Sequence, residues 1–142
     1  MIGVMKYTVA LGFALALAAL GAACSDPVAP NPPIAVVPTV TDTFTGTLTI
    51  GGNNLHQFTV SQPGGLKVTL TNVTPSAAVA LSVGTPSTAT GSCAALNGLT
   101  AVAGPSAQIS GTATVAGTFC VSVADVGNLV ETVNYTVSVL HS

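Results

Sequence analysis

Charged side chains are scarce in this sequence of 142 residues. Two lysines and four acidic residues, with no arginine, make up 4% of the chain, against roughly 25% in an average globular domain. Binding to nucleic acid needs rows of cations that neutralise phosphates, so this composition argues against nucleic acid as a partner. Disordered chains combine few apolar residues with high net charge, whereas 49% of this sequence is hydrophobic. The chain can therefore form a core.

Signs of helix are also few outside the N-terminus. The sequence has no tryptophan and little Glu or Lys, and it is rich in Thr, Ser, Ala, Val and Gly, a composition typical of strands. Residues 117–124 show the pattern most clearly, because Phe119, Val121 and Val123 alternate with small or polar residues. Cys120 has the opposite parity, so we expect it on the outer face, toward a loop that carries Cys93.

Alternation between turn residues predicts further strands at 42–50, 56–60, 66–70, 79–83, 108–115 and 133–140. Residues 84–104 are the least regular segment and contain only a short alternating stretch at 99–102. Gly111 interrupts its strand, where we expect a bulge. Seven to eight short strands predict an all-β fold, an antiparallel β-sandwich over residues 42–142.

Residues 1–23 have the features of a signal peptide with an N-terminal signal helix. Lys6 precedes an apolar run over residues 7–20 and small residues at 21–23, and the run is short for a membrane span. With Cys24 next, the segment resembles a bacterial lipoprotein signal. The resemblance implies acyl chains on Cys24 that anchor the protein in a membrane. The alternative is ordinary signal-peptidase cleavage, which leaves Cys24 as a free or paired thiol.

Residues 24–41 are predicted to be the lipidated cysteine and a Pro-rich linker, which favours an extended spacer. Assigning Cys24 to lipid leaves Cys93 and Cys120 as an even pair, which predicts a disulfide in an oxidising compartment. The alternative is two reduced, buried thiols. Ser25 resembles the signal for outer-membrane sorting. We expect the cell envelope as the location, lipid-anchored at the outer membrane or periplasmic side, or else secretion.

Short apolar motifs recur through the domain in the order Gly46-x-Leu48, His56-Gln57-Phe58-x-Val60, Gly65-Leu66-x-Val68-x-Leu70, Val79-x-Leu81, Gly117 to Val123 and Tyr135-x-Val137-x-Val139. This order resembles the bacterial pre-peptidase C-terminal domain. The resemblance implies a jelly-roll-like sandwich of the kind appended to secreted enzymes, with related modules that bind matrix polymers or calcium. Ala78 or Ala80 stands where the family commonly has an acidic residue, which argues against calcium binding here.

His56 and His141 are the only imidazoles in the sequence. A hydrolytic triad needs a nucleophile, a base and an orienting carboxylate. His56 has no acid near it in sequence, and His141 is expected to fray because it is the penultimate residue. We expect both to be exposed histidines at strand edges, and we predict no catalytic residues.

No cofactor and no metal site are predicted. Zinc would need several His, Cys or carboxylate ligands, and the two domain cysteines are assigned to the disulfide. The one set that resembles calcium ligands is Asp125, Asn128 and Glu131 in one turn, with Asp42 as a fourth. The alternative is that these side chains only solvate the turn and oppose edge pairing.

The sequence therefore predicts a non-catalytic exported lipoprotein whose sandwich binds a protein or polymer partner, including a polysaccharide, at the cell envelope. The contact surface would be an uncharged Thr/Ser face or residues 84–104. One alternative is a self-assembling structural surface protein that adds strands between copies. A third reading is an accessory of a secreted hydrolase or an enzyme.

Overall fold

The computed structural model describes residues 36–142, so the predicted signal peptide, Cys24 and most of the predicted linker lie outside the described residues. Within residues 36–142 the chain forms strands and no helix. This part of the chain therefore has no helix that could cross a membrane. The strands are β1 (Val40–Leu48), β2 (Asn53–Val60), β3 (Gly64–Thr74), β4 (Ala78–Ser87), β5 (Ser92–Val102), β6 (Gln108–Ala113), β7 (Gly117–Ala124) and β8 (Val133–His141).

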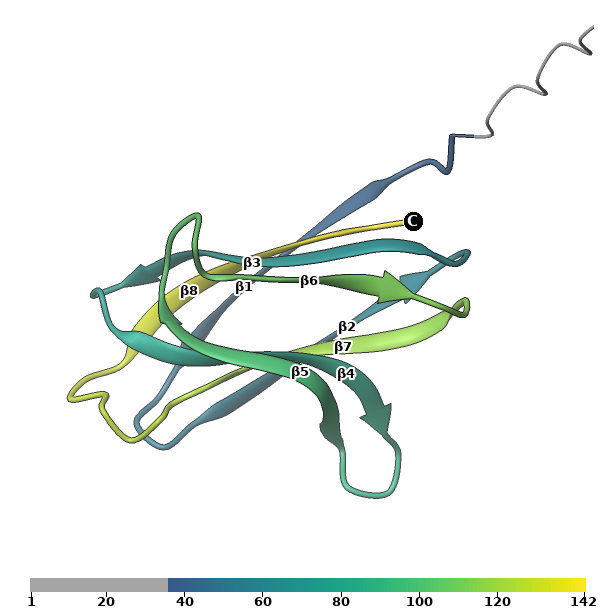
Figure 1. Ribbon diagram of the computed structural model, residues 1–142. Helices are drawn as coiled ribbons and strands as arrows, with labels where there is room; N and C mark the ends of the chain where they lie inside the picture. Colours follow the sequence, from purple (N-terminus) through teal and green to yellow (C-terminus); the bar gives the residue numbers. More distant parts are fainter. Residues whose placement is uncertain (1–35) are drawn as a thin grey trace, which may run out of the picture. The chain divides into compact units, whose positions relative to one another are not determined.

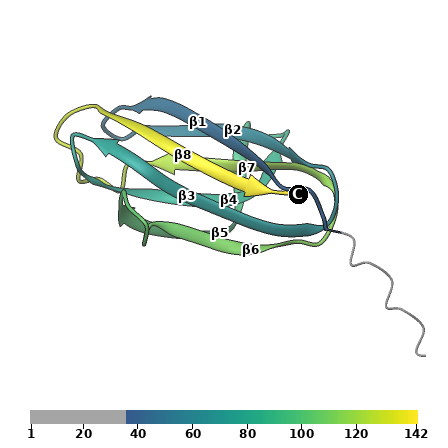
Figure 2. The ribbon, with the colours of Figure 1, turned by 90° about the horizontal axis from the view of Figure 1, so that it is seen from above.

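The strands form two four-stranded antiparallel sheets, in the orders β1-β8-β3-β6 and β2-β7-β4-β5 (Figures 1 and 2). Each strand of the first half pairs with its counterpart in the second: β1 with β8, β2 with β7, β3 with β6 and β4 with β5. This order arises when the chain forms one long hairpin with its turn between β4 and β5. The hairpin then winds so that β3 pairs with β8 and β4 pairs with β7. The fold is a jelly roll, which confirms the predicted antiparallel sandwich.

Alternating side chains from both sheets fill the space between the two layers. Along β7, Phe119, Val121 and Val123 are buried in the core, and the same holds for the alternating apolar residues of β8. Removing one Val, Leu or Phe side chain from water contributes about 1.5–3 kcal/mol, so this layer is the main source of stability. The other large core residues are Leu48, Phe58, Val60, Val68, Leu70, Val73, Val79, Leu81, Val83, Ile109 and Leu129.

The segment expected to be irregular is the main difference from the prediction. Residues 84–104 contain the end of β4 and the whole of β5. β5 is an edge strand in which only Cys93, Leu99 and Ala101 are half-buried, while the other eight residues are exposed. Because neither face of β5 is fully covered, its sequence is under no constraint to alternate, and the strand signal is absent.

Strand boundaries and bulges also differ in detail. β1 begins at Val40, two residues before the expected start of the domain, and ends at Leu48 rather than Ile50, which is exposed. The bulge expected at Gly111 is wrong, because β6 pairs with β3 in unbroken register. Two register shifts occur elsewhere: one between β4 and β5, where Leu96 has no partner, and one between β3 and β8, between Leu70 and Asn72.

The predicted disulfide between Cys93 and Cys120 is present, but it joins strands that are not neighbours. Cys120 lies on β7, Cys93 lies on β5, and β4 runs between them. The two Cα atoms are 5.9 Å apart, whereas two strand spacings in a flat sheet amount to about 9.5 Å. The paired ends of β4 and β5 therefore bend across the outer face of β7. Figure 1 shows this hairpin curving away from β6.

Gly84 permits this close approach. It lies opposite Cys120 in the ladder between β4 and β7, directly at the β4–β5 bulge. A Cβ atom at this position would collide with the backbone carbonyl of Ala94 on β5. Only glycine lets the two backbones come so near, so the bridge and Gly84 act together to bend the hairpin.

Asp125 connects two loops at one end of the sandwich. Its Oδ2 accepts a hydrogen bond of 2.8 Å from the N–H of Gly51, in the turn between β1 and β2. Its Oδ1 accepts bonds of 2.8, 3.1 and 3.2 Å from the N–H groups of Gly127, Asn128 and Leu129, after β7. The bond from Gly51, followed by those from the second loop, holds the pKa of Asp125 below its ordinary value.

Replacing Cys93 and Cys120 together by alanine is expected to lower the free energy of unfolding by roughly 3–4 kcal/mol, because a bridge that spans 27 residues restricts the unfolded chain. Urea unfolding followed by circular dichroism measures the change. Wild-type protein with and without a reductant is the control for lost packing at the buried Cys120 side chain. An unchanged urea midpoint in both comparisons would contradict a role for the bridge in stability.

Replacing Asp125 by asparagine is expected to weaken the acid dependence of stability. The folded pKa lies below the unfolded value of about 3.9, so the carboxylate stabilises the fold above about pH 4. That contribution is lost as the pH falls through the lower folded pKa. Thermal unfolding between about pH 2 and pH 7 should show a smaller decline for Asp125→Asn. Glu131→Gln, in the same loop, is the matched control, and equal declines in wild type and Asp125→Asn would refute the assignment.

A candidate binding site on the open side of the sandwich

The two long sides of the sandwich are built from different edge strands. β1 and β2 form one side, and β5 and β6 form the other, which we call the β5–β6 side. β5 and β6 contain neither a charged residue nor a proline. Charges and prolines are the usual devices that keep edge strands from pairing with other chains, and β5 retains only its bulge at Leu96. Of the two sides in the described part of the chain, the β5–β6 side is the one on which both edge strands lack a charge and a proline, since β1 carries Asp42.

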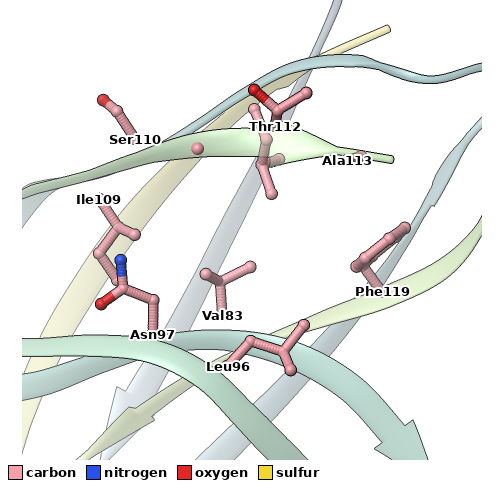
Figure 3. Close-up of a pocket in the computed structure, with 10 residues that line it drawn as sticks. Val83, Leu96, Asn97, Ile109, Ser110, Thr112, Ala113 and Phe119 are labelled. Carbon is pink, nitrogen blue, oxygen red and sulfur yellow. The ribbon is translucent and has the colours of Figure 1, made fainter. Parts of the chain in front are cut away.

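A cavity of about 190 Å³ opens on the β5–β6 side between the two sheets (Figure 3). In Figure 3, Val83 and Leu96 project from β4 and β5 toward β6, and Ile109 projects from β6 into the same space. Phe119 closes it on the side of β7. The cavity is lined by Leu66, Val83, Leu96, Asn97, Ile109, Ser110, Gly111, Thr112, Ala113 and Phe119, none of which is charged.

The cavity exists because a core-facing position has no side chain. Along β6, Ile109 and Ala113 are buried, and Gly111 lies between them at the same parity. A Cβ atom built on Gly111 would meet no other heavy atom within 4 Å. The position that would normally carry a core side chain is thus empty, and the space it leaves is continuous with solvent.

Leu96 stands at the mouth of this cavity. The bulge between β4 and β5 leaves it unpaired, and bulges characteristically redirect a side chain. The side chain is 72% exposed although it is apolar. Leu96 therefore extends the apolar wall of the cavity into solvent.

The structure separates the residues considered for calcium. Asp125, Asn128 and Glu131 belong to the loop between β7 and β8, but Asp42 lies near the start of β1, at the opposite end of the sandwich. Six residues of strand between Asp42 and Leu48 correspond to about 20 Å. The backbone N–H groups of two loops occupy both oxygens of Asp125. Among residues 36–142, no three His, Cys, Asp or Glu side chains are grouped so as to hold a metal ion.

Both predictions for His141 are wrong, because it is neither exposed nor frayed. It ends β8, is 3% exposed, and its Nε2 lies 3.0 Å from Oδ2 of Asp42. Its Nδ1 lies 3.2 Å from the backbone oxygen of Ser142. The Ser142 hydroxyl donates instead to the carbonyl of Gln62. The nitrogen that would activate a nucleophile in a triad therefore faces a carbonyl oxygen.

His56 is half-buried rather than exposed. Its Nε2 lies 2.7 Å from the phenol oxygen of Tyr135, and its ring stacks on Phe44 with the centroids 4.9 Å apart. Burial lowers the pKa of His56 and raises the pKa of Tyr135. Both groups are uncharged at neutral pH and share one hydrogen bond between the sheets. Neither histidine in the described part of the chain is hydrogen-bonded to a Ser or Thr hydroxyl.

Sequence reasoning missed the cavity, although one signal was present. The segment from Gln108 to Ala113 alternates, so Gly111 occupies a core-facing position between Ile109 and Ala113. Because Gly111 has the same parity as the buried Ile109 and Ala113, it indicates a missing core side chain rather than a bulge. The segment 84–104 is predicted as a candidate contact region in the form of a loop, whereas most of it forms the edge strand β5.

Comparison with known proteins identifies the fold but no family. No protein-family model and no curated protein matches this sequence, so the resemblance to the pre-peptidase C-terminal domain stays a prediction. A solved structure with a similar fold is PliG of Aeromonas hydrophila, a periplasmic inhibitor of g-type lysozyme. The match has a TM-score of 0.54 and 15% sequence identity, and covers 70% of this chain and 83% of PliG.

A second structure, of Bacillus endospore appendages described as disulfide-linked pili, gives a TM-score of 0.39 and 16% identity over 73% of this chain and 88% of that one. That TM-score is too low to establish a common fold. The match with PliG places this chain among β-sandwich proteins, in agreement with the observed jelly roll.

Proposed function

We propose that this protein is a non-catalytic, exported lipoprotein whose β-sandwich binds a protein partner at the cell envelope. The β5–β6 side is the contact surface. The observation that carries the proposal is the coincidence of two uncharged edge strands with an apolar cavity and the exposed Leu96 at its mouth. Exposed strand edges supply backbone hydrogen bonds to a partner, and an adjacent cavity supplies selectivity for a side chain.

Export is supported by two independent features. The disulfide between Cys93 and Cys120 requires an oxidising compartment such as the periplasm or the exterior. The N-terminal residues resemble a lipoprotein signal that would leave Cys24 acylated and would tether the sandwich to a membrane. The proposal combines both features in a domain held outside the cytoplasm by an N-terminal lipid.

A protein partner is favoured over a polysaccharide. Sugar-binding sites usually offer aromatic platforms, and Phe119 is the single aromatic residue in the cavity wall, where it is 8% exposed. The fold shared with PliG, a periplasmic lysozyme inhibitor, agrees with recognition of a protein without catalysis. At 15% identity this likeness does not identify lysozyme as the partner here.

Self-assembly is the second candidate, and the exposed edge of β5 favours it. The strand is eleven residues long and uncharged, so two copies could pair antiparallel without charge repulsion. The bulge at Leu96 opposes this, because it interrupts the edge that two copies would have to match. We therefore rank binding to a different protein above assembly.

Replacing Leu96 by lysine is expected to abolish binding of the envelope partner, because it puts a charge at the mouth of an apolar cavity. The mature protein, purified in detergent and immobilised, is exposed to the envelope fraction of the source cells. Val40→Lys is the matched control, since Val40 is an exposed apolar residue on the opposite edge, in β1.

The proposal requires a defined set of proteins that wild type and Val40→Lys retain and Leu96→Lys loses. Equal retention by all three variants would contradict it. Light scattering that rises with concentration for wild type, and is reduced by Leu96→Lys, would instead support self-assembly.

The intact mass of the mature exported protein is expected to correspond to residues 24–142 with added acyl chains and one disulfide, because Cys24 follows the small residues of the signal. Mass spectrometry with and without reduction measures all three features. The variant Cys24→Ala should remain unprocessed at this site and carry no lipid. A mature protein without acyl chains would show ordinary signal-peptidase cleavage instead.

A further inference from the structure

We infer that the cavity opened at Gly111 receives one uncharged apolar side chain, aromatic or branched aliphatic, from an extended segment of the partner that pairs with the free edge of β6. The inference rests on the proposed function, since it names the chemistry by which the β5–β6 side recognises a protein. Four observations on this side lead to it: the uninterrupted edge of β6, the missing side chain at Gly111, the cavity, and the absence of charge in β5 and β6.

β6 has an edge that an added strand could pair with. β6 pairs with β3 on one side, in unbroken register from Gln108 to Ala113, and it is the last strand of its sheet on the other. Ser110, Gly111 and Thr112 are exposed along it. β5 also has a free edge, but the bulge at Leu96 interrupts it. A regular added strand therefore fits β6 better than β5.

The side chains of a strand added to β6 would alternate between the two faces of the sheet. A strand added to a sheet continues its pleat, so alternate side chains lie on the inner face in line with Ile109, Gly111 and Ala113. The inward residue placed opposite Gly111 has no neighbouring side chain on β6 in its way. It faces the cavity between β6, Val83 and Phe119 (Figure 3).

The size and the uncharged wall of the cavity limit which side chain of the added strand can enter it. The cavity measures about 190 Å³, and an apolar cavity of about 150 Å³ in another protein holds benzene. One phenyl, isobutyl or sec-butyl group fits a space of this size. A charged side chain would lose its hydration without gaining a partner, because the wall carries no charge.

A second hollow of about 190 Å³ lies on the outer face of the same sheet, and it provides the internal control. It shares Leu66, Ser110 and Gly111 with the cavity, whereas Gly65, Lys67 and Leu140 line the hollow and not the cavity. A Cβ atom at Gly65, as at Gly111, meets nothing within 4 Å. Gly65 has the parity of Lys67, so a side chain there points outward.

Gly111→Val thus adds a side chain to the inner face of β6, and Gly65→Val adds the same side chain to the outer face of the neighbouring strand β3. Neither glycine has the positive φ that would disfavour valine. We expect Gly111→Val to fold and to raise Tm, because it fills a core position and restricts the unfolded chain. Gly111→Ala is the second variant if valine is too large.

The test uses acetylated, amidated heptapeptides with Thr and Val alternating around a central residue, which is Phe, Leu, Ala or Lys. Binding to the mature lipoprotein in detergent is measured by calorimetry. The Phe or Leu peptide is expected to bind at least tenfold more tightly than the Ala peptide, and the Lys peptide not at all, because only an apolar side chain gains from leaving water. Gly111→Val should abolish this preference, while Gly65→Val should bind as wild type does.

Three results would overturn the inference: no binding by the Phe and Leu peptides, equal binding by the Ala peptide, or an effect of Gly65→Val in place of Gly111→Val. The proposed function has its own readout. If Leu96→Lys loses the envelope partner while the peptides fail, the β5–β6 side binds a partner by another mode. If Leu96→Lys retains the partner, the proposed function fails whether or not the cavity accepts a peptide.

Discussion

The bridge between Cys93 and Cys120 is the constraint on which the open side of the sandwich depends. Because it joins β5 to β7 across β4, it can form only if the β4–β5 hairpin bends over the outer face of its own sheet. That bend carries the hairpin away from β6 (Figure 1). Gly84 makes the close contact possible, and the bulge at Leu96 accommodates it. The end of the hairpin consequently turns away from β6, on the side where the cavity lies.

The cavity then results from two features that act in the same place. The bent hairpin leaves Leu96 beside β6 without covering it, and Gly111 omits the side chain that would fill the remaining space. Filling a core position of this kind normally stabilises a protein, so an empty one is a loss of stability that folding does not require. A cavity held open by a covalent constraint on one side and by a glycine on the other is better explained by occupancy in a complex than by packing of the isolated chain.

Strands that bury one face were predictable from sequence, and the edge strand β5 was not. β7 and β8 each bury one face, so their apolar residues alternate and reveal both strands. β5 buries little on either face, and its composition resembles a loop. The pairing of Asp42 with His141 joins residues 99 positions apart, so no local pattern indicates it. The cavity depends on where the β4–β5 hairpin lies relative to β6. The inward parity of Gly111 indicates a missing core side chain, but it indicates a cavity only once the arrangement of the two sheets is known.

The buried polar groups of this fold are satisfied by hydrogen bonds, whereas its edge strands expose backbone groups. Within residues 36–142 every buried side-chain nitrogen and oxygen has a hydrogen-bond partner. The carboxylate of Asp125 is occupied by loop N–H groups, and each imidazole is held by its neighbours. Reactive sites are usually the places where such local satisfaction is given up. In the described part of the chain, the backbone edges of β5 and β6 and the apolar wall beside them are uncovered, as are the edges of β1 and β2. Under the proposed function, an added strand with an apolar side chain would cover these groups.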